Sequence, residues 1–237
     1  TKHLLEKSGA DKNAITALSI SGHSLGVVPI DKDGNLLCKS VPIWSDMRAE
    51  AQAKKFFADN SYENWYMETG NGFPAHLYSA FKILWYKENM PEMFEKADCF
   101  LGTKDYINYI LTGVKCTDNS YASGSGVYDL VKGKYDDSLI NAFGLKKSIF
   151  PEIVPSTQVL GTLTKEASQQ TGLPMHVKVV SGGVDNSCMA LGARGIADGR
   201  VYTSLGSSSW IAITSHKPIV DLKLKPFVFA HVIPGMF

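Results

Sequence analysis

The stretch from Val177 to Asp185 constrains the fold more than any other part of this sequence. Its valines at 177, 179 and 180 are typical of a short buried strand, and the small residues of 181–183 predict a turn. A helix is expected over 185–193. This arrangement would place the Asp185 carboxylate at the end of a strand, where open α/β folds bind ligands. The alternative is that Asp185 only caps the helix, and the two roles are compatible.

The rest of the chain alternates between strand and helix patterns. Short strands are expected over 15–20, 27–31 and 36–43, joined as an antiparallel meander with a turn at 31–35. Helices are expected from a cap at Ser45 or Asp46 to about residue 60, and then over 62–70, 78–90 and 103–111. A hairpin is expected over 200–204 and 209–214, and 217–237 has no self-contained pattern. The chain is therefore predicted to be of the α/β class.

The predicted hairpin turn contains Gly206 and three serines, Ser207 to Ser209. The backbone N–H groups and hydroxyls of such a turn can bind a phosphate, and an ordinary hairpin loop is the alternative. The sequence lacks the Walker motif GxxxxGK[ST], so phosphate binding of the P-loop type is not indicated.

A second candidate site combines Trp44, Asp46 and Arg48 at a strand-to-helix junction. The indole offers an apolar face to a sugar ring, while the two charged side chains can bind hydroxyl groups. The alternative is a capping Asp46 beside an exposed Arg48. A third candidate is the turn after the first strand. His23 in this turn either contacts a ligand or makes its hydrogen bonds within the turn.

Composition excludes some functions and leaves others open. The 237 residues carry 24 Lys and Arg against 23 Asp and Glu, so neither nucleic acid nor an anionic membrane is expected as a partner. The four cysteines are widely spaced and lack a zinc-binding pattern, so a reduced, cytoplasmic protein is expected. The first residue is Thr1, within a predicted helix end, and we expect the chain to be truncated at both ends.

Several segments in one order resemble the FGGY carbohydrate kinases, which include xylulokinases, ribulokinases, gluconate kinases and glycerol kinases. The motifs that carry the resemblance are Ser21 to Asp31, Ile43 to Arg48, Ser79 to Trp85 with Glu88-Asn89, Thr103 to Gly113, Thr117 to Ser123, Gly182 to Asn186, and Ser204 to Ser208. The resemblance covers most of the chain, and several ordered motifs are far more specific than any one of them.

The resemblance implies a ribonuclease-H-like domain of the actin and hexokinase superfold, with a mixed sheet flanked by helices. It further implies a sugar-binding domain over 1–203 whose first strands are missing. Residues 204–237 would begin an ATP-binding domain that is mostly missing.

The resemblance also implies roles for individual residues. Asp185 would be the general base that accepts the proton of a sugar hydroxyl, with ATP and Mg²⁺ supplying the phosphoryl group. The implied sugar-binding residues are Ser24, Leu25, Trp44, Asp46, Arg48 and Asn186. Gly206 and Ser207 would approach the nucleotide phosphates, and none of these residues is nominated as a metal ligand.

One departure bears on the substrate. Where this chain has Ser24-Leu25, xylulokinases usually carry Met-His and glycerol kinases carry Arg-Glu. Leucine, unlike histidine or arginine, cannot donate a side-chain hydrogen bond to a sugar hydroxyl. A pentulose such as xylulose is the first expectation, with another polyol or a sugar acid such as glycerol or gluconate as the alternative. A non-catalytic sugar sensor and an ATPase or acid kinase of the same superfold are the other hypotheses. The fragment alone is expected to be inactive, and a homodimer remains an open expectation.

Overall fold

The computed structural model describes residues 1–206 and 209–237. The α-helices are α1 (Lys2–Ser8), α2 (Glu50–Asp59), α3 (Tyr62–Thr69), α4 (Ser79–Asn89), α5 (Pro91–Lys96), α6 (Thr103–Thr112), α7 (Asn119–Ala122), α8 (Asp137–Ala142), α9 (Lys165–Thr171) and α10 (Asp185–Gly192). Short 3-10 helices occupy Lys12–Ala14, Ala75–Leu77 and Lys147–Ile149. The strands are β1 (Ala17–Gly22), β2 (Val28–Ile30), β3 (Cys99–Leu101), β4 (Cys116–Asp118), β5 (Tyr128–Asp129), β6 (Lys134–Tyr135), β7 (Glu152–Val154), β8 (Val159–Thr162), β9 (Lys178–Val184), β10 (Val201–Leu205) and β11 (Ser209–Ile213).

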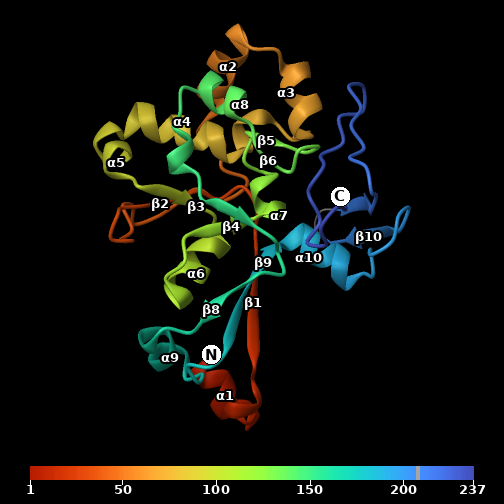
Figure 1. Ribbon diagram of the computed structural model, residues 1–237. Coiled ribbons are helices and arrows are strands. Elements are labelled where there is room, and N and C mark those ends of the chain that lie inside the picture. Colours follow the sequence, from red (N-terminus) through yellow and green to blue (C-terminus); the bar gives the residue numbers. More distant parts are fainter. Residues whose placement is uncertain (207–208) are drawn as a thin grey trace.

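The central sheet is mixed, as predicted. Strand β9 pairs in parallel with β1 and antiparallel with β8, in the order β1-β9-β8. Figure 1 shows β1 and β9 side by side, with α1 and α9 near the lower ends of these strands and helices α2 to α5 and α8 gathered at the opposite end of the molecule. The other strands form pairs: β2-β3, β4-β7, β5-β6 and β10-β11.

Local capping signals set the ends of the helices that were predicted correctly. The hydroxyl of Ser61 accepts the N–H of Asn64 and so caps α3, which ends at Gly70 in the left-handed region with φ 64°. Gly113, with φ 80°, ends α6 in the same way. Helix α10 begins at Asp185 as expected, and the hairpin of β10 and β11 is antiparallel.

The predicted meander is wrong, and so is the strand over 36–43. Strand β2 pairs with β3 rather than β1, and only Leu36 forms an isolated bridge, to Ile30. The chain leaves the line of β1 through Leu25, whose φ of 62° lies in the left-handed region. Further along, Pro42 has no N–H to donate to a sheet ladder, so the segment continues as irregular structure.

Two further boundaries differ from the sequence-based expectation. The small residues Ser181 to Gly183 belong to β9 and do not form a turn. Gly183 pairs with Ser21 of β1, while Ser181 and Gly182 lie in the register shift and donate their N–H groups to the carbonyl oxygens of Gln158 and Ser156. Helix α2 begins at Glu50, and neither Ser45 nor Asp46 caps it. The Asp46 carboxylate is already occupied by Arg48, which binds it through both Nε and Nη2.

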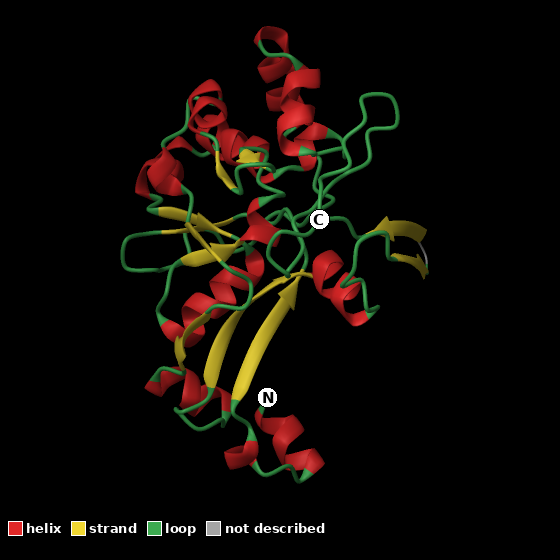
Figure 2. Cartoon of the chain, turned by 45° about the vertical axis from the view of Figure 1, so that its right-hand side comes forward, coloured by secondary structure: helices red, strands yellow, loops and turns green. Residues whose placement is uncertain are grey.

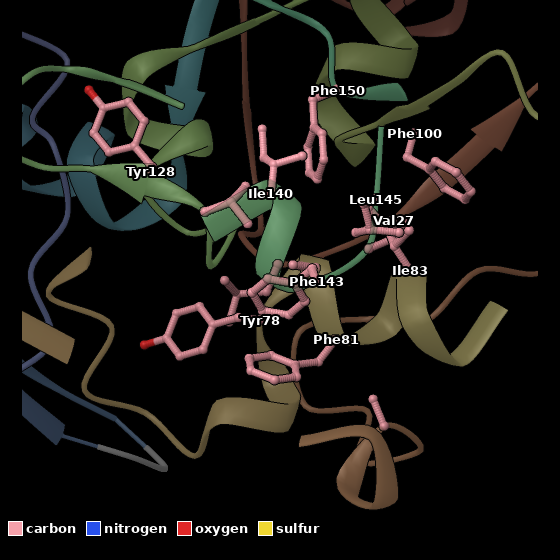
Figure 3. Close-up of a cluster of buried hydrophobic side chains, with 14 of the residues drawn as sticks. Val27, Tyr78, Phe81, Ile83, Phe100, Tyr128, Ile140, Phe143, Leu145 and Phe150 are labelled. Carbon is pink, nitrogen blue, oxygen red and sulfur yellow. The ribbon is translucent and has the colours of Figure 1, made fainter. Parts of the chain in front are cut away.

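The main core lies among the helices gathered at the end opposite α1 and is rich in aromatic rings. The ring of Phe143 stacks on Phe56 with centroids 4.1 Å apart and meets Phe81 edge-on at 4.9 Å. Figure 3 shows Phe81 and Phe143 side by side, and Ile140 of α8 belongs to the same cluster. Complete burial of one such side chain contributes about 2–3 kcal/mol, so this cluster is a major part of the stability. Trp65 and Tyr86 are also core residues.

A second core joins the central sheet to its covering helices. Val179 of β9 and Val177, which precedes the strand, are buried in one cluster with Leu111 of α6 and Ala167 of α9. Strand β9 is therefore held by neighbouring strands on both edges and by two helices on one face. These contacts constrain the position of its carboxyl end.

Candidate functional site

The candidate site is built on the carboxyl ends of the parallel strands β1 and β9. Gly22 and Val184, the last residues of the two strands, are paired with each other. The loop that holds Ser24 and Leu25 follows β1, and α10 follows β9, with α10 visible in Figure 1 at the end of β9. Both segments therefore leave the sheet at one edge, which is where ligands of open α/β sheets bind.

Asp185 is the first residue of α10 and is exposed to solvent. Its Oδ1 accepts a hydrogen bond from the N–H of Asn186 at 2.9 Å. A carboxylate in the first turn also interacts favourably with the helix dipole. The exposed position leaves the other carboxylate oxygen available to accept a proton or a hydrogen bond.

Glycines allow the backbone to pass very close to its neighbours just before Asp185. Gly182 has φ 71°, and a Cβ placed there would lie 2.1 Å from the carbonyl oxygen of Ile20. A Cβ on Gly183 would lie 2.4 Å from Val232 and 2.9 Å from the Ser120 hydroxyl. These positions therefore require glycine, since any side chain would push β9 away from β1 and from the C-terminal segment.

The loop after β1 is buried rather than open. Ser24 is 7% exposed and Leu25 is 1% exposed, with the Leu25 side chain in the main core. His23 Nδ1 lies 2.8 Å from the carbonyl oxygen of Ser24, which agrees with its interpretation as a turn histidine. The sequence did not reveal that Leu25 adopts a left-handed backbone, which is uncommon for a residue with a side chain and costs about 1 kcal/mol or more.

The turn from Trp44 to Arg48 combines an exposed indole with a closed ion pair. Trp44 is 47% exposed. Arg48 donates to Asp46 from Nε at 2.9 Å and from Nη2 at 2.8 Å, and its guanidinium lies 4.7 Å from the ring centre of Trp85. The hydrogen bonds from Arg48 lower the pKa of Asp46, so this carboxylate is ionised.

A buried lysine connects these two segments. Lys82 of α4 has no exposed surface, and its Nζ donates to the carbonyl oxygens of Leu25, Ile43 and Trp44 at 3.0, 2.7 and 3.2 Å. The structure thus brings the loop after β1 and the Trp44 turn together around one ammonium group.

Asn186, unlike Asp185, lines a cavity of about 250 Å³, together with residues of the hairpin and of the C-terminal segment, including Tyr202, Trp210, Phe229 and His231. The Tyr202 hydroxyl lies 3.4 Å from the Asn186 carbonyl oxygen, and Figure 2 shows the strand pair of this hairpin beside α10. Gly206 forms an exposed bend at the tip of the hairpin, and Ser207 lies outside the described residues.

The C-terminal segment is irregular in structure but is buried against the start of α10. This contact was not predicted from the sequence. Ala230 accepts a hydrogen bond from the Ser187 hydroxyl of α10 at 2.9 Å and donates its N–H to the Ser123 hydroxyl at 3.1 Å. His231 is 5% exposed, and burial lowers its pKa. The apolar run from Val228 to Ala230, with Val232 after His231, is the sequence signal that could have indicated this burial.

Acidic side chains from α3, β5 and the cap of α8 also approach one another. Oxygen atoms of Glu68, Asp129 and Asp136 lie within 4.8 Å of each other. Lys132 Nζ lies 2.6 Å from Asp129 and 3.7 Å from Asp136, so a cation of the chain itself already balances these carboxylates. Separately, none of the helices that the structure describes is long and apolar enough to cross a membrane.

Comparison with known proteins agrees with the fold. A profile of the FGGY family of carbohydrate kinases, N-terminal domain, matches residues 1–192. Over 231 residues the chain is 31% identical to a xylulose kinase of Bacillus subtilis (strain 168), covering 96% of this chain and 45% of that protein. The chain therefore spans about half the length of the curated relatives it matches.

Solved structures give the same result. The crystal structure of xylulose kinase from Rhodospirillum rubrum has a TM-score of 0.87 and 28% identity, covering 97% of this chain and 47% of that one. The crystal structure of gluconate kinase from Lactobacillus acidophilus has a TM-score of 0.83 and 25% identity, covering 92% of this chain and 44% of that one. The expected ribonuclease-H-like α/β fold is thereby confirmed, and the chain belongs to the FGGY family of carbohydrate kinases, whose N-terminal domain it contains.

Proposed function

We propose that this chain is the sugar-binding part of an enzyme that transfers the γ-phosphoryl group of ATP to a hydroxyl of a small sugar or polyol. The observation that carries the proposal is the exposed Asp185 carboxylate at the first position of α10, at the shared edge of β1 and β9. A general base must reach the hydroxyl it deprotonates, and Asp185 is on rigid elements with one oxygen available.

In the proposed reaction Asp185 accepts the proton of the attacking hydroxyl. The sugar oxygen then forms a bond to phosphorus while the bond to the ADP oxygen breaks. ATP, bound with Mg²⁺, would supply the phosphoryl group and the charge neutralisation that phosphoryl transfer requires. The remaining contribution of this chain is to hold the sugar so that its hydroxyl lies at the Asp185 carboxylate.

The proposed sugar contacts differ in how they are presented. Trp44 offers an exposed ring face, and Asn186 offers an amide at the start of α10. Asp46 and Arg48 are proposed to contact hydroxyl groups at the rim while bound to each other. Ser24 and Leu25, which are buried, are proposed to shape the floor of the site. The packing of Leu25 into the core supports a sugar pocket without a side-chain donor at that position.

On the nucleotide side, the chain offers the exposed bend at Gly206, where a phosphate can approach the backbone. Ser207 is proposed to share this role. The hairpin is also the proposed start of the ATP-binding domain, with 1–203 as the sugar-binding domain. That proposed boundary falls within β10, which spans Val201–Leu205.

A pentulose such as xylulose is the proposed substrate, because curated relatives and solved neighbours are named xylulose kinases. The likeness to a gluconate kinase structure supports a sugar acid as the second candidate. The test uses the protein of the complete reading frame and measures ADP release with pentuloses, hexuloses, polyols and aldonic acids. One class of sugar should stimulate release, and Asp185→Asn should lower kcat by about a hundredfold or more.

Two results would contradict the proposal. ATP binding with no sugar-stimulated turnover would instead favour a non-catalytic sensor, and sugar-independent turnover would favour an ATPase. Residues 1–237 alone are expected to release no ADP above background, because a kinase site of this kind needs groups that bind ATP as well as sugar. Sugar-dependent ADP release by residues 1–237 would show that the chain is sufficient for catalysis.

A further inference from the structure

Three charged side chains lie completely buried behind the junction of β9 and α10. Lys104 Nζ of α6 lies 2.5 Å from Asp105 Oδ1 and 2.9 Å from Asp118 Oδ1, and none of the three side chains is exposed. Burial opposes the charge on Lys104, but the two carboxylates raise its pKa above the ordinary value. Two carboxylates thus share one ammonium group, and a buried carboxylate in excess needs further hydrogen-bond donors.

Asp118 finds those donors in two serine hydroxyls. Its Oδ2 accepts from Ser120 Oγ at 2.5 Å and from Ser156 Oγ at 2.6 Å. Both serines are buried, at 0% and 5% exposure. With respect to Asp118 the two hydroxyls are therefore nearly equivalent.

The two serines differ in what lies beyond Asp118. Ser120 Oγ also accepts a hydrogen bond from the backbone N–H of Val184 at 3.0 Å. A hydroxyl that donates to a carboxylate is polarised and becomes a stronger acceptor, so the bond to Val184 gains from the ion pair behind it. The result is a continuous path from the Lys104 ammonium through Asp118 and Ser120 to the residue that precedes Asp185.

The same cluster holds β9 at a second point. The carbonyl oxygen of Ser181 accepts hydrogen bonds from Asn108 Nδ2 at 2.7 Å and from Lys104 Nζ at 3.3 Å. The two attachment points, Ser181 and Val184, lie on either side of Gly182 and Gly183. Glycine has the greatest backbone freedom of any residue. The direction of the chain after Gly182 and Gly183 therefore depends on hydrogen bonds from neighbouring segments.

We propose that Ser120 is a positioning residue for Asp185. It connects the buried Lys104–Asp118 ion pair to the Val184 N–H and so sets the direction in which the chain leaves β9 and begins α10. Ser120 acts through the backbone and does not touch the substrate. The proposal rests on the proposed function of Asp185 as general base, because a base displaced by a fraction of an ångström loses its alignment with the hydroxyl.

The test compares Ser120→Ala with Ser156→Ala in the protein of the complete reading frame. Each variant removes one buried hydroxyl from Asp118 Oδ2, but only Ser120→Ala also removes the acceptor for the Val184 N–H. We expect kcat of Ser120→Ala to fall about ten- to a hundredfold below that of Ser156→Ala, with the KM for sugar unchanged in both. Amide hydrogen exchange over 180–190 should be faster in Ser120→Ala only, while the Tm of the two variants falls by similar amounts.

Equal kcat values in the two variants overturn the proposal. It is also overturned if a smaller fraction of folded protein accounts for the whole loss of kcat in Ser120→Ala. Equal exchange rates over 180–190 also overturn it. Failure of the proposed function has a different signature: the unsubstituted protein shows no sugar-stimulated ADP release, or Asp185→Asn keeps the full kcat. In that case the role of Ser120 in catalysis falls with the proposed function, and the exchange data report the restraint on β9 alone.

Discussion

Lys82 Nζ donates a hydrogen bond to the carbonyl oxygen of Leu25 at 3.0 Å, although 57 positions separate the two residues. The same ammonium group binds the carbonyl oxygens of Ile43 and Trp44. Leu25 adopts its uncommon left-handed backbone at this contact. One buried cation thus fixes both segments that are proposed to shape the sugar site, and its removal should affect both together.

Lys82→Met should destabilise the protein, because three backbone carbonyls would lose their donor inside the fold. The expected loss is about 2–4 kcal/mol in the free energy of unfolding, measured by urea denaturation. Lys87→Met is the matched control on the same helix, since Lys87 is exposed and donates to the Gly144 carbonyl alone. The control should lose less than about 1 kcal/mol. Similar losses in the two variants would show that the Lys82 contacts contribute little.

The stability should also depend on pH through Lys82. Burial lowers its pKa from 10.5 to about 8, with Asp46 opposing the shift and Arg48 adding to it. Between about pH 8 and 10.5 the unfolded chain holds this proton and the folded chain has released it, so the contribution of Lys82 to stability rises with pH across this window. The difference in unfolding free energy between the unsubstituted protein and Lys82→Met should therefore grow from pH 8 to 10.5. A difference that stays constant or shrinks would contradict the assignment.

Gly182→Ala should be severely destabilising. The new Cβ would lie 2.1 Å from the Ile20 carbonyl oxygen, and φ is 71°, so both sterics and backbone conformation oppose it. We expect a loss of at least about 2–3 kcal/mol in unfolding free energy. Gly192→Ala at the end of α10 is the control, because a Cβ added there has no neighbouring atom within 4 Å. This variant should change the free energy of unfolding by less than about 1 kcal/mol. Equal thermal midpoints for the two variants would refute this account of the β1–β9 contact.

Trp44→Ala should weaken sugar binding with little effect on folding. The indole is 47% exposed, so little of its surface contributes to the core. In the protein of the complete reading frame we expect the KM for sugar to rise about tenfold or more, as for other tryptophans at the centre of a contact. Met47, which is 59% exposed in the same turn, gives the control Met47→Ala with an unchanged KM. An unchanged KM in Trp44→Ala would remove Trp44 from the proposed site.

The elements that were predicted correctly depend on short-range information. The caps Ser61 and Gly70 mark α3, and Gly113 marks the end of α6. The helix at Asp185 was also predicted, because an acidic residue followed by helix-forming residues is a local pattern. The motifs of the FGGY family were recognisable in one order along the chain, and the family profile confirms them.

The errors occurred where a side chain or a backbone segment finds a partner other than the one that its local pattern favours. Asp46 was expected to cap a helix, but Arg48 occupies its carboxylate. Ser181 to Gly183 read as a turn because small residues favour turns, yet the pairing of Gly183 with Ser21 and the backbone hydrogen bonds of Ser181 and Gly182 extend them into β9. The C-terminal segment has no periodic pattern, because its backbone is satisfied by contacts such as Ser123 with Ala230 rather than by a helix or sheet.

The sequence by itself therefore determined the family, the longer helices and the presence of an acidic residue at the start of α10. These features need only near neighbours, since caps, turns and periodicity act within a few residues. Only the tertiary structure decided that Lys82 joins Leu25 to Trp44 and that Ser120 holds the strand before Asp185. Both contacts depend on burial and on hydrogen bonds between segments far apart in the chain, and spacing along a sequence does not specify which buried donor meets which acceptor.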